Sequence, residues 1–310
     1  MATAIGVAQQ VDWDVPEQTG LWKDAWIRFR RNRLAVAGLV VIVVLIVMAI
    51  GSRLPTTPGG LWKILHIAGD PFQQDVTNSV APPSLSHPFG TDALGRDVFA
   101  RVLYGSSISL TIGILVQFLI LAVGGTIGMV AGYLGGWIDN LLMRFTDIMY
   151  AFPDLLLVLV FVAAFSNGPR LLTIFAAIAL VNWVGLARLV RGQVLSIKEK
   201  EYVEAARMTG TSPFKLIVKH LIPNSLGPVI VTLTFGIPAA IFTEAALSFL
   251  GIGIRPPEPS WGVMIEDGYG AIFADQGLVI FPAIAVALTM LSFTFVGDGL
   301  RDALDPRMKR

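Results

Sequence analysis

Two carboxylates lie inside long apolar stretches of the sequence, where an ionisable side chain is costly and marks a functional position. Asp154 follows Pro153, and Glu244 lies in a second apolar stretch with Ser248 four residues further on. Residues four apart share a helix face, so Glu244 and Ser248 are expected side by side. Each carboxylate could contact the ammonium group of a small solute or could hydrogen-bond a neighbouring helix. Asp154, Glu244 and Ser248 are therefore candidates for the lining of a polar route.

The other reactive residue types argue against catalytic and metal chemistry. The chain contains no cysteine, and its three histidines, His66, His87 and His220, are too far apart in sequence to suggest a metal site. No glycine-rich stretch is followed by the lysine and hydroxyl residue of a nucleotide-binding P-loop. No nucleophile elbow or His-Glu-x-x-His helix is present either. We expect no catalytic residue, metal or cofactor in this chain, and its net charge of +1 argues against nucleic acid as a partner.

A short polar segment between two apolar stretches predicts a pair of helices joined by a sharp turn. The stretch 201–210 reads as an amphipathic helix ended by Gly210, which can adopt a left-handed conformation without strain. Ser212 and Pro213 are typical of the cap and first position of a following helix. The small Ala205 and Ala206 would let this elbow enter a groove on a partner, with Arg207, Lys215 and Lys219 at the rim. The alternative is a surface helix that touches only headgroups and water.

Membrane-spanning helices must position these residues. Of the 310 residues, 54% are hydrophobic and 15% are charged, whereas a soluble domain carries about 25% charge. A helix needs about 20 mostly apolar residues to cross the hydrocarbon core. Six stretches approach or exceed that length and predict an all-α integral membrane protein. The predicted spans are 34–50, 107–131, 138–165, 171–189, 226–250 and 278–296.

The distribution of basic residues predicts the orientation of the spans. With the N-terminus in the cytoplasm, the inner segments hold 16 lysines and arginines and the outer segments hold 6. The positive-inside rule therefore favours cytoplasmic N- and C-termini. A stretch at 97–104 is expected to lie along the membrane surface. The predicted parts are a cytoplasmic segment 1–33, a retained anchor 34–50, an external loop 51–105, a transmembrane core 106–300 with a cytoplasmic loop at about 199–224, and a cytoplasmic tail 301–310.

Other features of the spans are interpreted as packing. Arg144 and Asp147 are three residues apart near the start of the third span and could form an ion pair on one helix face. Pro153 predicts a kink beyond them, which would place Asp154 about 15 Å deeper than Arg144 by the helical rise. Glycines at a spacing of four predict a smooth strip for close helix contact; they are Gly124, Gly128, Gly132 and Gly136.

Several motifs together resemble the permease subunits of bacterial ABC importers. Glu204, Ala205 and Ala206, with Gly210 and Pro223 at the expected distances, are similar to the EAA loop, which in that family docks into the ATP-binding subunit. The general pattern has an aliphatic residue where this chain has His220, and the stretch 220–224 instead resembles the peptide-permease branch. Further stretches that resemble the C-type subunit of oligopeptide, dipeptide and nickel permeases are 87–97, 187–192, 244–251, 259–262 and 297–306.

The resemblance covers nearly the whole chain from Phe29 onward. It implies the type I ABC importer permease fold, with a cytoplasmic coupling helix, in a bacterial or archaeal cell membrane. Half of a translocation pathway for peptides or similar small solutes would be formed by this chain and half by a non-identical B-type permease. Two ATP-binding subunits would hold ATP and magnesium, a solute-binding protein would dock outside, and lipid would surround the spans. The implied coupling residues are Tyr202, Glu204, Ala205, Ala206, Arg207, Gly210, Pro213 and Pro223.

The residues also allow other classes of membrane protein. An ion-coupled secondary transporter could use Asp154 and Glu244 as proton sites, although such proteins usually have internal repeats and more spans. A membrane-embedded enzyme would need a paired nucleophile and base, which the sequence does not show. Relatives in the permease family carry peptides, nickel chelates, glutathione or sugars, because selectivity lies largely in the external binding protein. The resemblance therefore implies a class of solute and not one compound.

Overall fold

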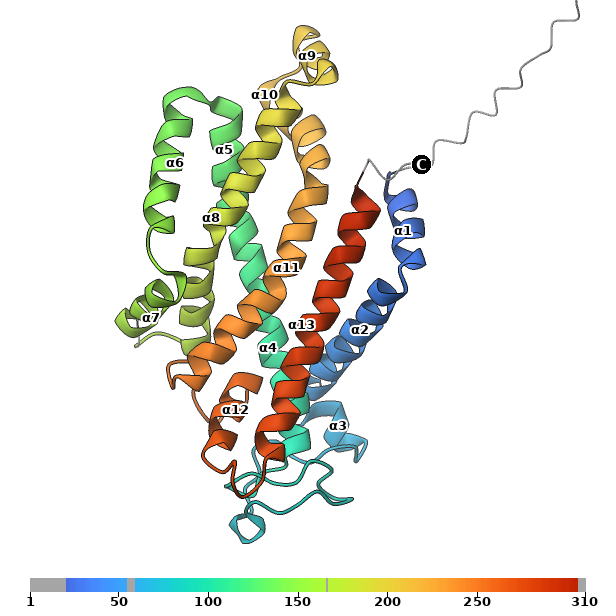
Figure 1. Cartoon of the computed structure of the whole chain (residues 1–310), viewed down its shortest axis with the longest axis vertical. Helices are drawn as coiled ribbons and strands as arrows, with labels where there is room; N and C mark the ends of the chain where they lie inside the picture. Colours follow the sequence, from blue (N-terminus) through green and yellow to red (C-terminus); the bar gives the residue numbers. More distant parts are fainter. Residues whose placement is uncertain (1–20, 55–58, 166, 306–310) are drawn as a thin grey trace, which may run out of the picture.

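The structure, a computed structural model, describes residues 21–54, 59–165 and 167–305 as helices joined by turns and loops (Figure 1). No strand occurs in these ranges, which confirms the predicted all-α class. Within the described residues, five helical runs are long and apolar enough to cross a membrane. They are α2 (Arg33–Arg53), the run of α4 (Val98–Ile120), η2 (Leu121–Gly125) and α5 (Thr126–Leu134), α8 (Arg170–Lys198), the run of α10 (Pro213–Leu216), η3 (Ile217–Leu221) and α11 (Ile222–Phe249), and α13 (Gly277–Leu304).

The third predicted span is a broken helix and not a kinked one. It forms α6 (Gly136–Tyr150) and α7 (Asp154–Ala164), which meet at an angle of 87°. Pro153 explains the break, because proline has no N–H to donate and it disfavours helical backbone at the residue before it. Counting the bent pair as one span brings the total to six.

Several helices run beyond the predicted apolar stretches. The second span begins at Val98 and not at 107, so the stretch 97–104, expected on the membrane surface, is instead the buried start of α4. Asp97 caps this helix by accepting the N–H groups of Phe99 and Ala100 at 2.9 and 3.2 Å. The run of α10, η3 and α11 begins at Pro213, so most of the predicted cytoplasmic loop is helical. Hydropathy marks only the part of a helix that lies in lipid, and these helices continue past it because neighbouring segments pack against them.

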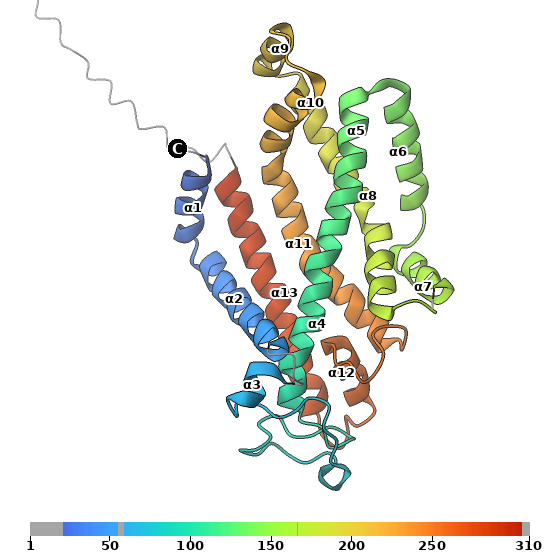
Figure 2. The same ribbon diagram turned by 180° about the vertical axis from the view of Figure 1, so that it is seen from behind.

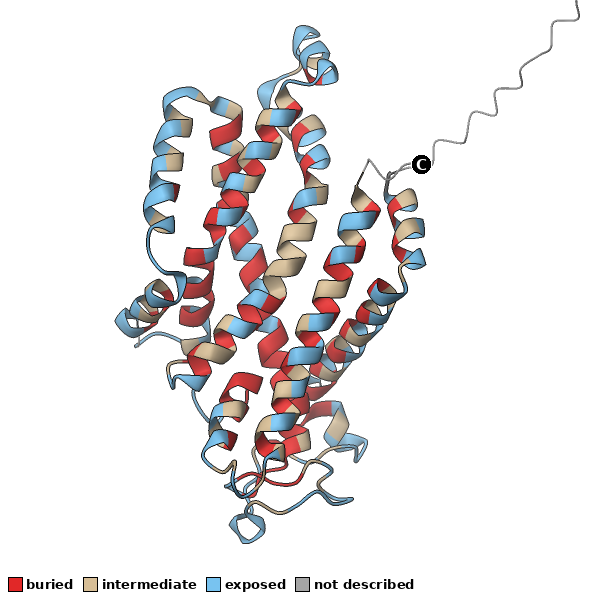
Figure 3. Ribbon diagram, in the orientation of Figure 1, coloured by how far each residue is buried: buried red, intermediate tan, exposed pale blue. Residues whose placement is uncertain are grey.

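Two clusters of buried apolar side chains hold the bundle together (Figure 3). One joins α4, α7, α8 and α11, and the other joins α2, α12 (Trp261–Tyr269) and α13 with the N-terminal helix α1 (Leu21–Arg31). α1 was not predicted, although its aromatic residues recur at helical spacing. Of the predicted termini, residues 1–20 and 306–310 lie outside the described residues.

The glycine strip packs against α8, as expected for three of its four members. A side chain at Gly124 would place its Cβ 2.6 Å from the carbonyl oxygen of Trp183, and one at Gly132 would place it 2.8 Å from Cβ of Val194. Gly128 lies equally close to the backbone of α8. Gly136 departs from the prediction, because a Cβ added to it would meet nothing within 4 Å and its φ of +59° serves the turn into α6.

The predicted elbow and the loop between α2 and α4 lie at opposite ends of the bundle (Figures 1 and 2). α9 (Glu201–Met208) and α1 are at one end. The loop between α2 and α4, with α3 (Gly60–Ile64) and η1 (Val76–Asn78), is at the other end together with α12. This arrangement is consistent with the predicted separation of the elbow from the loop 51–105.

Candidate functional site

The elbow predicted at 201–213 is present and its turn is fully hydrogen-bonded. α9 ends at Met208, and Gly210 adopts a φ of +80°. The Gly210 N–H donates to the carbonyl of Arg207 at 3.0 Å, and the Thr211 N–H donates to that of Ala206 at 3.1 Å. This pair of bonds is the Schellman ending of a helix, which requires a left-handed residue where glycine stands. Gly210 therefore sets the direction in which the chain leaves α9.

The helix after the turn begins as predicted, with one difference. Pro213 occupies the first turn of α10, where its missing N–H has no helical partner to lose. Ser212 is in the cap position, but its side chain makes no capping hydrogen bond. α10 then continues through the π-helical segment η3 into α11, so Pro223 lies in the first turn of α11 and is exposed. The elbow is thus continuous with the long apolar run that ends at Phe249.

Three side chains fix the elbow to the bundle. Val203 and Leu221 are fully buried and Leu216 is 1% exposed, all in the core cluster that includes α8. Tyr202 lies beside His220, with 6.2 Å between ring centroids. His220, which departs from the general family pattern, therefore lies next to a side chain of α9.

The opposite surface of the elbow is open. Met208, the last residue of α9, is 84% exposed, and Phe214, in α10, is 76% exposed. Glu204, Ala205 and Arg207 are also exposed, whereas Ala206 is partly buried. Large exposed apolar side chains next to charged ones are typical of a surface that binds another protein.

Glu244 forms a buried joint between α11 and α12. Its side chain is fully buried, and one carboxylate oxygen accepts the hydroxyls of Ser248 at 2.7 Å and Ser260 at 2.6 Å. Ser260 also caps α12 by accepting the N–H of Val263 at 3.2 Å. The predicted neighbourhood of Glu244 and Ser248 is confirmed. In this structure Glu244 bonds to a second helical element, which is one of the two roles that the sequence left open.

Asp154 lies in a different setting from the one predicted. It is the first residue of α7 and is exposed, because the chain turns sharply just before it. The helical-rise argument for its depth is therefore wrong, since no continuous helix connects Arg144 to it. α7 packs on α8, whereas Glu244 faces α12.

The charges of α6 pair with α8 and not with each other. Asp147 accepts a hydrogen bond from Arg188 at 2.7 Å, so the predicted pair of Arg144 and Asp147 is replaced by an interhelical one. Asp139 accepts both Nε and Nη2 of Arg191 at 2.5 and 2.7 Å. A helix-surface rule finds partners three or four residues away, whereas here the partners lie about 40 to 50 residues away on another helix, and the contact of Asp139 with Arg191 is bidentate.

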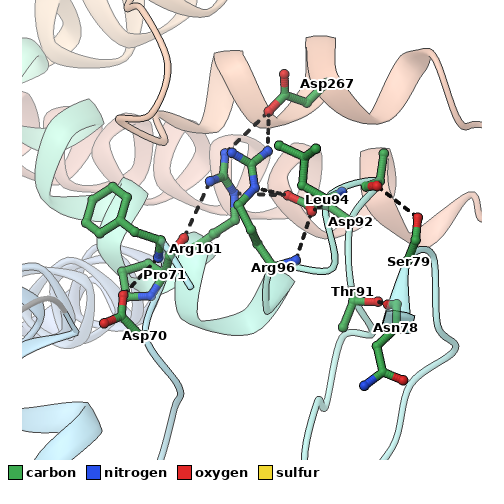
Figure 4. A network of polar contacts seen from close by, with 12 residues as sticks. Asp70, Pro71, Asn78, Ser79, Thr91, Asp92, Leu94, Arg96, Arg101 and Asp267 are labelled. Atoms are coloured by element: carbon green, nitrogen blue, oxygen red, sulfur yellow. Dashed lines mark hydrogen bonds and ion pairs between the residues drawn. The ribbon is translucent and has the colours of Figure 1, made fainter. Parts of the chain in front are cut away.

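A second polar cluster at the far end of the bundle was not predicted (Figure 4). Arg96 and Arg101 are 6% and 2% exposed and share two carboxylates. Asp92 Oδ2 lies 2.6 Å from Arg96 Nε and 3.5 Å from Arg101 Nε, and Asp267 Oδ2 lies 3.2 and 3.3 Å from the two Nη2 atoms. The cluster borders a cavity of about 130 Å³ and ties the loop before α4 to α12. Its four charges balance, as buried charges require.

Sequence reasoning missed Ser260, Arg101 and Asp267 as parts of polar sites. Arg101 and Asp267 are 166 positions apart, and no local pattern relates them. The only local signal was the spacing of Asp92 and Arg96, which are four residues apart. Among the described residues, no group of three or more potential ligands could hold a metal ion.

These features define a class of protein: a multi-pass α-helical membrane protein with an exposed helical elbow at one end. Residues 124–310 match the family model described as the binding-protein-dependent transport system inner membrane component. Residues 20–83 match the N-terminal TM domain of oligopeptide transport permease C. The chain therefore belongs to the binding-protein-dependent family of ABC importer permeases and is OppC/DppC-like.

Curated relatives match almost the full length. The chain is 42% identical to the oligopeptide transport system permease protein OppC of Bacillus subtilis (strain 168), over 94% of this chain and 91% of the relative. It is 45% identical to the dipeptide permease DppC of the same strain, over 93% and 86%. It is 39% identical to the glutathione permease GsiD of Escherichia coli O6:K15:H31, over 93% and 91%.

A solved structure confirms the fold independently of sequence. A chain of the MetNI methionine ABC transporter, in inward facing conformations, superposes with a TM-score of 0.52. The match covers 66% of this chain and 96% of that chain at 16% identity. The type I permease architecture expected from the sequence is thus present.

Proposed function

We propose that the elbow at 201–213 of this permease couples ATP hydrolysis on separate subunits to the movement of solute across the membrane. The observation that carries the proposal is the exposed tip of Met208 and Phe214 on a turn whose backbone is fully hydrogen-bonded and continuous with α11. A rigid, exposed element joined to a membrane helix can pass a movement of its partner into the bundle. The residues proposed to contact or support the ATP-binding subunit are Tyr202, Glu204, Ala205, Ala206, Arg207, Gly210, Pro213 and Pro223.

The solutes we propose are di- and oligopeptides or similar small solutes. Support comes from the names of relatives at 39% to 45% identity, which act on oligopeptides, dipeptides and glutathione. A non-identical second permease would complete the pathway, and the exposed Asp154 is available to face it. Glu244, which is buried in this chain, would line the route only after α12 moves away from it.

The remaining partners follow from the proposed orientation. The elbow and α1 would lie in the cytoplasm, where two ATP-binding subunits carry ATP and magnesium. The opposite end, with α12 and the loop 59–97, would face outward to receive solute from a binding protein. No enzymatic activity is assigned to this chain itself.

Substitutions in the elbow test the coupling role. In Gly210→Val, a β-branched residue must adopt a φ near +80°, so the turn after α9 is disrupted. We expect solute import by the complete transporter in proteoliposomes to fall at least tenfold while ATP hydrolysis persists, no longer stimulated by the binding protein. Glu204→Ala, at an exposed position, is expected to show the same uncoupling with an unchanged fold.

Gly210→Asn is the matched control, because asparagine tolerates the left-handed conformation. It should retain most of the import rate. Membrane insertion and complex assembly are measured for each variant by purification of the intact complex. Normal import by the Gly210→Val and Glu204→Ala transporters would show that the elbow is not the coupling element.

A further inference from the structure

The helix α1 carries a stripe of aromatic and basic side chains that the rest of the described chain leaves exposed. Trp22 is 61% exposed, Trp26 is 51% exposed and Ile27 is 44% exposed. Lys23, Arg30 and Arg31 are exposed as well. Two large exposed indoles beside basic groups indicate a binding surface, since such a patch in water is unfavourable.

The positions of these residues around α1 form one continuous band. At about 100° per residue, Ala25 and Phe29 share the face that packs against the other helices. Trp22 and Trp26 come next around the helix, and Arg30 and Lys23 lie beyond them. The guanidinium of Arg30 lies 5.7 Å from the ring centroid of Trp26, a cation–π contact that keeps charge and indole together.

The stripe is held in a fixed direction because α1 is docked on α13. Arg28 donates to the carbonyl of Asp305 at 3.1 Å and to that of Asp24 at 3.3 Å. Gly299 lets α1 approach closely, since a Cβ there would lie 3.1 Å from the ring of Phe29. The surface is therefore preorganised and its side chains face away from the bundle.

The stripe lies directly before a helix that is long and apolar enough to cross a membrane. α1 ends at Arg31 and the apolar α2 begins at Arg33, so only Asn32 separates them. Leu34, in the first turn of α2, is 59% exposed and apolar, as expected of a residue at the edge of a hydrocarbon core. Tryptophan favours the membrane interface, and lysine and arginine at that level attract anionic headgroups.

We propose that the stripe of Trp22, Lys23, Trp26, Ile27, Arg30 and Arg31 binds anionic phospholipid in the leaflet on the α1 side of the bundle. Its basic groups complement the negative headgroups, and the indoles occupy the boundary between headgroup and acyl chain. The naming of that leaflet as cytoplasmic rests on the proposed function. The lipid contact itself depends only on α1 and α2, and it would hold the end of α13 at a fixed height relative to the membrane.

A single spin label tests the proposal. Because the chain contains no cysteine, Ile27→Cys provides one labelling site on it. The complete transporter, its other subunits cysteine-free or blocked, is placed in nanodiscs of phosphatidylcholine with or without phosphatidylglycerol. Collisions of the nitroxide with oxygen and with a water-soluble nickel chelate are then compared. We expect phosphatidylglycerol to raise oxygen accessibility relative to the chelate, and Arg30→Gln with Arg31→Gln to remove most of that lipid dependence, since each arginine contributes to the attraction of an anionic surface.

The control is Lys215→Gln with Lys219→Gln, which removes two exposed basic residues at the elbow and should leave the lipid response of the label unchanged. Lys23→Gln serves if the arginine pair prevents assembly. Equal exposure of the label to the chelate in both lipid mixtures would overturn the proposal. Import measured on the same preparations separates the two proposals. If a transporter with an unaltered elbow shows the expected lipid response but does not couple ATP hydrolysis to import, the result counts against the proposed function alone.

Discussion

At the scale of single residues, Glu244 shows how a buried carboxylate can act as a hydrogen-bond acceptor between two helices without its charge being required. One of its oxygens accepts two serine hydroxyls from different helices, and its other oxygen has no hydrogen-bond partner in the described part of the chain. An amide in its place keeps the accepting oxygen and puts an NH₂ group at the unpartnered position. The joint between α11 and α12 therefore needs an acceptor at this point more than it needs an ionised group.

Substitution of Glu244 separates these two properties. Glu244→Gln should change the free energy of unfolding of the complex by no more than about 1 kcal/mol, because the hydrogen bonds from both serines persist. Glu244→Ala leaves two buried hydroxyls without their acceptor and opens a cavity, so we expect a loss of about 2–4 kcal/mol. Thermal unfolding of the purified complex in detergent measures both values. A strongly destabilised Gln variant, or one with altered solute selectivity and normal stability, would favour a role for the charge itself.

Only part of this joint was visible in the sequence. Ser248 was predicted as a neighbour of Glu244 because the two are four residues apart on one helix. Ser260 was not, since its approach depends on the reversal of the chain between α11 and α12, 16 residues on. Residue-scale prediction succeeds here within one helix and fails between helices.

At the scale of elements, helix type and turn chemistry were predictable and helix length was not. Gly210 and Pro213 act through local backbone preferences, so the elbow was found without tertiary information. The start of α4 at Val98 and the end of α8 at Lys198 depend on burial against neighbours, which hydropathy does not report. The position of the bend at Pro153 was predicted from the sequence. Its angle of 87° was not, because that angle depends on how α7 packs on α8.

The contact between α5 and α8 supplies a prediction at this scale. Gly128→Ala adds a methyl group against the Ala187 carbonyl, with Cβ of Val190 at 2.8 Å, and should destabilise the complex by about 1–3 kcal/mol. Gly192→Ala is the matched control on α8, because nothing lies within 4 Å of the added Cβ. It should be neutral or stabilising by up to about 1 kcal/mol through helix propensity. Equal unfolding temperatures for the two variants would contradict the assigned packing.

At the scale of the whole molecule, the arrangement of the ends makes the orientation testable. Ser86 is exposed in the loop before α4, and Met208 is exposed at the tip of the elbow, at opposite ends of the bundle (Figure 1). Ser86→Cys should react with a membrane-impermeant maleimide added to intact cells freed of any outer barrier. Met208→Cys, in cells that lack the ATP-binding subunits proposed to cover it, should react only after the membrane is opened. The reverse pattern would show that the charge-based orientation is wrong.

The shared carboxylates of Arg96 and Arg101 also bear on how the chain is made. Asp267 lies 166 positions after Arg101, and ribosomes add roughly 5 to 20 residues per second, so the second acceptor emerges roughly ten to thirty seconds later. During that interval the nascent chain holds two adjacent guanidiniums with Asp92 as the only carboxylate of the cluster yet synthesised. Completion of the cluster thus coincides with the synthesis of α12, and a chain interrupted before that helix would reach the quality-control machinery with an unbalanced positive site.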